Sequence, residues 1–158
     1  MQRTLILFLL EGILGYVVQH FAIVIGMHGV AKHKIVWHRV ILVSAVCATV
    51  LYMIRKLPML QFGVHTMLIC LVTNALCILV CKMDVRKSVL GSVIMMILIL
   101  LSDLVNFGVA SMVMDVSEIS TFLKDPVNKA FSALPGNFTV LLVASLIYKL
   151  RMRKAKAA

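Results

Sequence analysis

Residues 88–114 have the sequence SVLGSVIMMILILLSDLVNFGVASMVM, in which Asp103 is the one charged residue. An α-helix rises 1.5 Å per residue, so about 20 apolar residues cross the ~30 Å hydrocarbon core of a bilayer. This run is long enough to do so. Its length and apolar character therefore predict a transmembrane helix rather than a helix of a water-soluble domain.

The rest of the chain has the same apolar character. Of the 158 residues, 62% are hydrophobic and 14% are charged, and the mean hydropathy is +1.06. An ordinary soluble domain contains about 45–50% apolar residues. A soluble fold of this length could not remove so much apolar surface from water. We therefore predict an all-α, polytopic integral membrane helical bundle.

Charged residues and prolines divide the chain into about five transmembrane helices and one short amphipathic interfacial helix. The predicted spans cover residues 5–27, 36–54, 62–81, 88–114 and 137–150, and the amphipathic segment covers 117–134. Pro58 is expected to break the helix after the second span, and Pro135-Gly136 to end the amphipathic helix. Residues 1–150 would form one membrane domain, followed by a basic cytoplasmic tail at 151–158.

The positive charge points to lipid rather than to nucleic acid. The net charge is +10, but the basic residues lie between apolar runs, not on a face shared with aromatic residues. The predicted partner is the lipid bilayer, with no nucleic acid. Placing the C-terminus in the cytoplasm puts eleven of the 16 Lys and Arg residues on the inner side. The positive-inside rule therefore predicts a cytoplasmic membrane protein with its N-terminus outside.

Ionisable residues inside the spans are the candidate site residues. Placing a charged side chain near the bilayer centre costs at least ~2.5–3.5 kcal/mol, which makes such residues candidates for function. Glu11 and Asp103 lie inside spans, with Gln19 and Asn106 on the same helix faces at three- and four-residue spacing. With His65 on the third span, they could line an outward-facing ligand pocket. The alternative is that they hold helices together as buried polar contacts.

The cysteines and the remaining histidines suggest no further chemistry. Every cysteine lies in an apolar run, so a disulfide framework is not expected, and no metal site, cofactor or catalytic residue is predicted. His28, His33 and His38 recur at intervals of five and are interpreted as interfacial residues.

Short motifs along most of the chain resemble a known family. They are Glu11-Gly12, YMIRKLP at 52–58 leading to FGVHT at 62–66, and Asp125-Pro126 ahead of a final basic span. Together they resemble the multi-span N-terminal sensor region of bacterial, mainly Firmicute, GHKL-type histidine kinases. Those kinases continue into a phosphoacceptor helix and an ATP-binding domain, for which these residues leave no room. The resemblance implies a free-standing sensor region that regulates a partner histidine kinase and forms a homodimer.

Three functions follow from these observations. The first is a non-catalytic membrane sensor or regulatory module for signal transduction. The second is the substrate-binding component of a transporter that takes up a vitamin-like small molecule. The third is a membrane cysteine peptidase using His65 and Cys70, which is disfavoured because five residues of helix place the two side chains on different sides.

Overall fold

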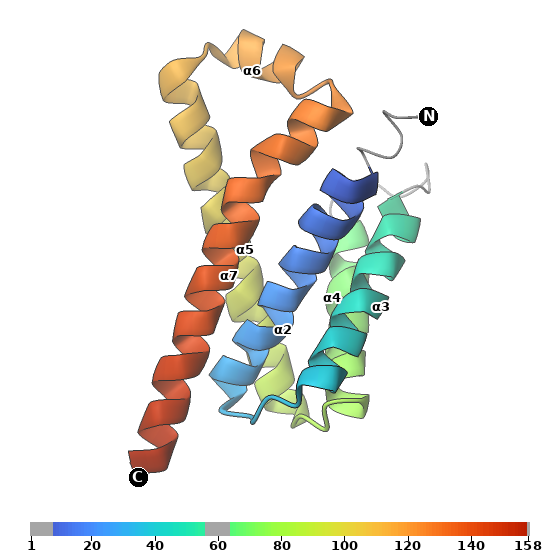
Figure 1. Cartoon of the computed structure of the whole chain (residues 1–158), viewed down its shortest axis with the longest axis vertical. Helices are drawn as coiled ribbons and strands as arrows, with labels where there is room; N and C mark the ends of the chain where they lie inside the picture. Colours follow the sequence, from blue (N-terminus) through green and yellow to red (C-terminus); the bar gives the residue numbers. More distant parts are fainter. Residues whose placement is uncertain (1–7, 56–63, 158) are drawn as a thin grey trace.

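The computed structural model describes residues 8–55 and 64–157, which form helices and short connections without a β-strand (Figure 1). The elements are the π-helix η1 (Phe8–Val17) and the α-helices α2 (Val18–Ala31), α3 (Trp37–Arg55), α4 (Val64–Leu79), α5 (Val85–Val113), α6 (Val116–Phe122) and α7 (Pro126–Ala157). Helix α2 continues η1 directly, and the successive long helices run antiparallel. The predicted all-α class is confirmed.

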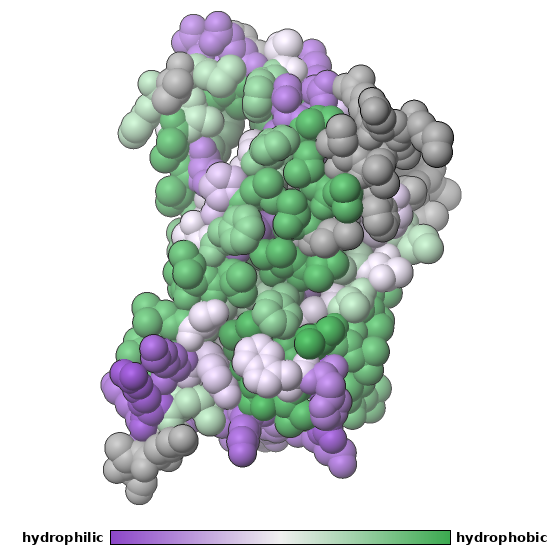
Figure 2. Space-filling model, in the orientation of Figure 1, coloured by the Kyte–Doolittle hydropathy of each residue, from purple (hydrophilic) through white to green (hydrophobic). Residues whose placement is uncertain are grey.

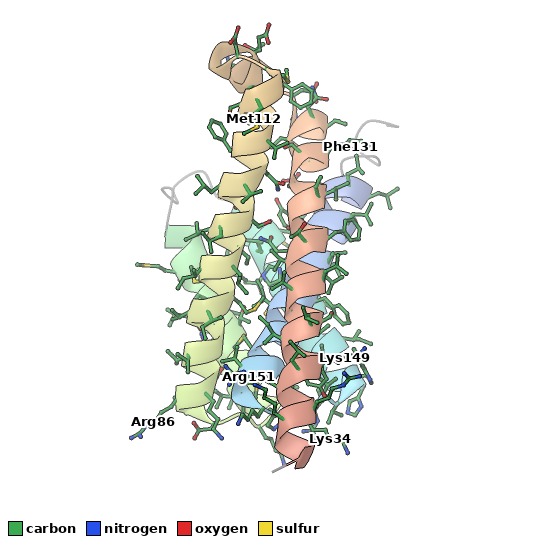
Figure 3. The ribbon with its side chains drawn as sticks, turned by 90° about the vertical axis from the view of Figure 1, so that its left-hand side faces the viewer. Lys34, Arg86, Met112, Phe131, Lys149 and Arg151 are labelled. Carbon is green, nitrogen blue, oxygen red and sulfur yellow. The ribbon has the colours of Figure 1, made fainter. Side chains whose placement is uncertain are left out.

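The bundle has two ends of different character. At one end lie the α2–α3 and α4–α5 connections and the C-terminal part of α7, and we call this the basic end. Its basic residues include Lys34, Arg86, Lys149 and Arg151 (Figure 3). The start of η1 and the short helix α6 lie at the opposite end, which we call the α6 end. Figure 2 shows a broad apolar band between polar residues at the two ends.

Within residues 8–55 and 64–157, four helices are long and apolar enough to cross a bilayer, which indicates an integral membrane protein. They cover Leu9–Ala31, Trp37–Ile54, Val85–Met112 and Pro126–Lys154. Helix α4 has 16 residues, or about 24 Å, which is less than the ~30 Å core. It nevertheless runs antiparallel to α3 and α5 in the same bundle (Figure 1). The predicted start of this span, at residue 62, lies outside the described residues.

Acidic residues set the start of three helices. The Asp84 side chain accepts a hydrogen bond from the Lys87 amide at the start of α5. Asp115 and Glu118 form a capping box at the start of α6. Asp125 accepts a hydrogen bond from the Val127 amide, directly before α7. These side chains satisfy amide donors that the first turn of a helix leaves without backbone acceptors.

The prediction that Pro135-Gly136 ends a helix is wrong. The separate interfacial helix α6 has seven residues, and residues 126–134 form the first part of the 32-residue helix α7. A proline inside a helix removes one backbone hydrogen bond but does not prevent tertiary contacts from holding the helix together. Here the Ser102 hydroxyl of α5 donates to the Gly136 carbonyl at 3.3 Å. Helix α7 also continues through the predicted tail boundary at residue 150.

Small residues bring α2 close to its neighbours in the half of the bundle nearer the basic end. Gly29 lies against the backbone of Tyr148 on α7, and Gly91 of α5 lies against Met27. Glycine allows such close approach because it has no Cβ atom, a common device in membrane helix packing. His28 is buried beside them, and its Nδ1 lies 2.8 Å from the Val24 carbonyl. His28 is therefore packed inside the bundle near the end of α2, and its position at the membrane interface stays a prediction.

A polar seam joins α4 to α5 in the same half of the bundle. Asn74 donates to the Ser92 hydroxyl at 2.8 Å and accepts from the Ser88 hydroxyl at 2.9 Å. It also donates to the Cys70 carbonyl at 2.9 Å. All the polar atoms of the Asn74 amide are thus engaged within the protein, so this seam is a helix–helix contact of the kind that stabilises membrane bundles.

Candidate functional site

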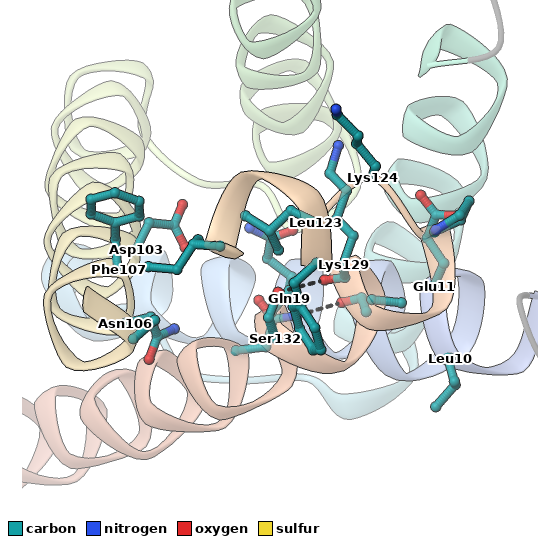
Figure 4. Close-up of a pocket in the computed structure, with 18 of the residues that line it drawn as sticks. Leu10, Glu11, Gln19, Asp103, Asn106, Phe107, Leu123, Lys124, Lys129 and Ser132 are labelled. Carbon is teal, nitrogen blue, oxygen red and sulfur yellow. Dashed lines mark hydrogen bonds between the residues drawn. The ribbon is translucent and has the colours of Figure 1, made fainter. Parts of the chain in front are cut away.

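At the α6 end the helices surround a cavity of about 640 Å³ (Figure 4). Its lining comes from the first long helix, formed by η1 and α2, from α5, from α6 with the following connection, and from the first turns of α7. A volume between about 300 and 1,000 Å³ is typical of small-molecule sites. The cavity is therefore large enough for a small molecule and is built from segments far apart in the sequence.

Four of the five predicted site residues line this cavity. They are Glu11, Gln19, Asp103 and Asn106. Glu11 and Asp103 belong to opposite walls, with Glu11 on η1 and Asp103 beside Asn106 on α5 (Figure 4). The fifth residue, His65, is in the first turn of α4, but its side chain lies outside the described residues. No described residue of α4 contributes to the lining.

Glu11 is held by its own helix. The Tyr16 hydroxyl donates a hydrogen bond to the Glu11 carboxylate. The two residues are five apart, which is the hydrogen-bond spacing of a π-helix, and both lie in η1. The wider turn of the π-helix thus brings a carboxylate and its donor together beside the cavity. Such helices are uncommon and are often found at functional sites.

Helix α7 contacts η1 at the point where the π-helix gives way to α2. The buried Asn137 side chain donates to the Gly15 carbonyl at 3.3 Å. A change from π to α hydrogen bonding disturbs the regular pairing of carbonyls and amides, so a side chain from another helix is a suitable donor here. Asn137 also lines the cavity. Its polar side chain inside an apolar helix was the only sequence signal that could have identified it.

The α5 wall presents polar and apolar residues on one helix face. Asp103, Asn106, Phe107 and Ala110 are spaced by three, four and seven residues, and all line the cavity. The polar residues of α5, Ser88 and Ser92 at one end and Asp103 and Asn106 at the other, therefore have different surroundings. Near the basic end they pack against α4, whereas near the α6 end they face the hollow.

Two lysines complete the charge pattern. Lys124, in the connection after α6, and Lys129, near the start of α7, both line the cavity. Neither lysine was among the predicted site residues, because both fall in the predicted amphipathic segment 117–134 rather than in a span. With Glu11 and Asp103 they give the cavity two acidic and two basic side chains. Such a lining can hold a polar molecule by ion pairs and hydrogen bonds.

The described residues contain no group of three or more His, Cys, Asp or Glu side chains placed to hold a metal ion. Cys70, the nucleophile of the disfavoured peptidase hypothesis, lies beside the polar seam, with its sulfur 3.7 Å from the Ser92 hydroxyl. No protein-family model, curated protein or solved structure matches this chain. The resemblance to sensor regions of histidine kinases therefore stays a prediction, and the function has to be argued from the cavity.

Proposed function

We propose that this chain is a non-catalytic membrane sensor module that binds a small molecule in the cavity at the α6 end. The observation that carries the proposal is the convergence of Glu11, Gln19, Asp103 and Asn106 on one cavity. These residues were selected only because polar groups are costly inside a membrane. Their spacing along two helices did not require them to meet.

The cavity favours binding over the alternative role of buried polar contact. A polar contact between helices satisfies its groups within the protein, as Asn74 does between α4 and α5. Asp103 and Asn106 line a hollow large enough for a small molecule, and Asp103 is an exposed residue. Ionisable groups at membrane depth commonly face a water-filled cavity or mark a ligand path. The polar residues of the α5 wall border a cavity in this way.

The bundle crosses the membrane five times in this proposal, with α4 as the short third span. The basic end faces the cytoplasm, in accordance with the positive-inside rule, and the α6 end faces outward. Helix α7 connects the two sides, since its first turns line the cavity and its last turns carry Arg151, Arg153 and Lys154. Ligand binding would be transmitted along α7 to a cytoplasmic partner such as a histidine kinase, with the chain acting as a homodimer.

Retention of a small molecule tests the proposal. The native chain and the Glu11→Gln/Asp103→Asn double variant are purified from the same membranes in mild detergent. Bound small molecules are then identified by mass spectrometry. We expect a molecule in the native sample that is lost from the double variant, because amides preserve shape but remove both carboxylate charges.

The matched control is Asp84→Asn, an acid-to-amide change at the basic end. Asparagine is also a good helix N-cap, so this variant keeps the start of α5 intact. It should retain the molecule as the native chain does. Equal small-molecule content in the native chain and the double variant would contradict the proposal. A vitamin-like molecule retained by the native chain would favour the transporter alternative.

A further inference from the structure

We infer that Cys77 and Cys81 are a thiol pair that hydrogen peroxide oxidises to a disulfide, with His28 as the group that accepts the thiol proton of Cys81. The site lies at the basic end, where α2 and α4 both end (Figure 1). It is separate from the cavity at the α6 end and goes beyond the proposed sensor function. The inference is carried by the contacts of these three side chains and by their burial.

The Cys81 thiol contacts both a second thiol and an imidazole ring. It hydrogen-bonds to the Cys77 thiol and to His28. The other two cysteines are bonded to hydroxyl groups instead. The Cys47 sulfur lies 3.4 Å from the Thr73 hydroxyl, and the Cys70 sulfur is bonded to Ser92. Cys81 thus has a base beside it and a second thiol in reach, which is the arrangement found at redox-active cysteines.

The ring of His28 is held so that one nitrogen is available to Cys81. Its Nδ1 lies 2.8 Å from the Val24 carbonyl, which can only accept, so Nδ1 carries a proton and donates it. In the neutral ring, Nε2 is then an acceptor. The ring of His33 packs edge-on against that of His28, with the centroids 5.4 Å apart. His28 can therefore take the thiol proton of Cys81, which is how an imidazole activates a thiol as a nucleophile.

Two similar helix ends bring these groups together. After α2, the His33 amide donates to the His28 carbonyl at 2.9 Å, and after α4 the Met83 amide donates to the Cys77 carbonyl at 3.2 Å. Each turn contains one non-glycine residue with a positive φ angle. Such turns fold the chain back over the last turn of the helix. Cys81 therefore lies in the turn that follows α4 and not in the helix itself.

This position allows Cys81 to form a disulfide with Cys77. Residues four apart within a helix have Cβ atoms about 5–6 Å apart, whereas a disulfide needs about 3.5–4.5 Å. Helix α4 ends at Leu79, so the turn at Cys81 can close the remaining distance of about 1–2 Å without breaking the helix. Oxidation would thus shift the start of the α4–α5 connection.

Burial selects a small oxidant. Cys77 is fully buried and Cys81 is 2% exposed, but the next residue, Lys82, is exposed. The reactive sulfur is therefore close to the surface and yet closed to a bulky reagent such as oxidised glutathione. Hydrogen peroxide is only slightly larger than water and needs a much smaller opening of the turn.

The reaction balances in two steps. The Cys81 thiolate attacks one oxygen of hydrogen peroxide, the O–O bond breaks, and the sulfur becomes a sulfenic acid. The hydroxide that leaves takes the proton held by His28 and becomes water. The Cys77 thiol then attacks the Cys81 sulfur, an S–S bond forms, and the S–O bond breaks. The hydroxyl group leaves with the Cys77 proton as a second water, so two thiols have given two electrons to one peroxide.

Peroxide treatment of the full chain in lipid nanodiscs tests the inference. After timed exposure, the remaining thiols are blocked with N-ethylmaleimide in SDS, and the peptides are identified by mass spectrometry. We expect a disulfide between Cys77 and Cys81 that dithiothreitol reverses. It should form at least about tenfold faster than Cys47 or Cys70 is oxidised. Oxidised glutathione at the same concentration should produce it at least about tenfold more slowly than peroxide.

Three variants assign the roles within the site. In Cys77→Ser, Cys81 should stop at the sulfenic acid, which dimedone labels. In Cys81→Ser, Cys77 should remain a thiol. His28→Gln should slow the oxidation of Cys81 by at least about tenfold. The matched control is His38→Gln, a change of an exposed histidine in the first turn of α3 at the same end, which should leave the rate unchanged.

Each result supports or overturns the inference. Equal oxidation rates at all four cysteines would overturn it, and so would the absence of a dimedone label on Cys81 in Cys77→Ser. Equal rates with oxidised glutathione and peroxide would show that the site is open and the oxidant class wrong. An unchanged rate in His28→Gln would remove His28 from the reaction. The oxidation rate of Cys70 reports whether that variant is folded, and the native chain and the serine variants decide the inference without it.

Discussion

The two halves of this bundle contain similar polar residues but use them differently. Near the basic end, Asn74 and Ser88 meet between α4 and α5 and satisfy each other. Near the α6 end, Asp103 and Asn106 lie on the same helix α5 but face a cavity of about 640 Å³. The residues differ in surroundings more than in type. Gly29 of α2 and Gly91 of α5 let these helices lie close to their neighbours in the first half, whereas in the second half the helices surround a hollow beside the contact of Asn106 with Gly136.

This contrast shows what decides the role of a polar residue inside a membrane. Its free-energy cost is offset either by a partner on the neighbouring helix or by water and ligand in a cavity. Which of the two applies depends on the distance between the helices. Three pairs of matched substitutions, one in each half of the bundle, test this contrast.

The largest difference in the free energy of unfolding is expected between two glycine substitutions. A methyl group added at Gly29 would lie 2.8 Å from the Tyr148 backbone, whereas one added at Gly108 would meet nothing within 4 Å. We expect Gly29→Ala to lower the free energy of unfolding by about 3 kcal/mol, because α2 and α7 must separate. Gly108→Ala should raise it by about 0.5 kcal/mol through higher helix propensity. Unfolding in mixed micelles of mild detergent and SDS measures both values.

Equal effects of the two glycine substitutions would contradict the comparison. It would then follow that α2 and α7 are no more tightly packed than the cavity end of α5. A stabilising effect of Gly29→Ala would contradict it more strongly, because it would show that the α2–α7 contact has room for a side chain.

A smaller difference in the free energy of unfolding is expected between two asparagine substitutions. Asn74→Ala leaves the Ser88 and Ser92 hydroxyls without their amide partner, and we expect it to lower the free energy of unfolding by about 1 kcal/mol. Asn106→Ala should lower it by less, about 0.5 kcal/mol, because Asn106 packs against Gly136 of α7 but also borders the cavity, where water can replace its hydrogen bonds. The same micelle titration measures both. A larger loss for Asn106→Ala would identify the cavity wall as a structural contact.

The difference in the free energy of unfolding is expected to be no larger between two tyrosine substitutions. The Tyr148 hydroxyl accepts from the Ile35 amide at 3.2 Å near the basic end, and the Tyr16 hydroxyl donates to Glu11 beside the cavity. Tyr148→Phe should cost about 1 kcal/mol, since it removes the acceptor of a partly buried backbone amide. Tyr16→Phe should cost about 0.5 kcal/mol, because Glu11 can bond to water instead.

Ligand binding provides the second measurement for the tyrosine pair. Tyr16→Phe should reduce retention of the bound small molecule by less than Asp103→Asn does, and Tyr148→Phe should leave retention unchanged. If Tyr148→Phe weakened binding as strongly as Asp103→Asn, the two halves of the bundle would not be independent.

The fold class could be predicted because its evidence is local. Apolar runs with few charges identify helices in a membrane without reference to any other part of the chain. The helix boundaries were less predictable where tertiary contacts intervene. Pro135 was expected to end a helix, but α7 continues through it, with Ser102 of α5 bonded to the next residue. The count of five spans depends on α4, whose described part is shorter than the bilayer core.

The sequence was enough to predict a helical, apolar protein. It also identified Glu11 and Asp103 as residues that raise the free energy of membrane insertion, because that cost depends on each residue and its immediate neighbours. Only the tertiary structure decided which polar residues pack between helices and which line a cavity. Asn137 meets Gly15 across 122 positions of the chain, and Asp103 shares a cavity with Lys124 of the connection after α6 and Lys129 of α7. Contacts between such distant segments depend on the distances between whole helices, which local sequence patterns do not predict.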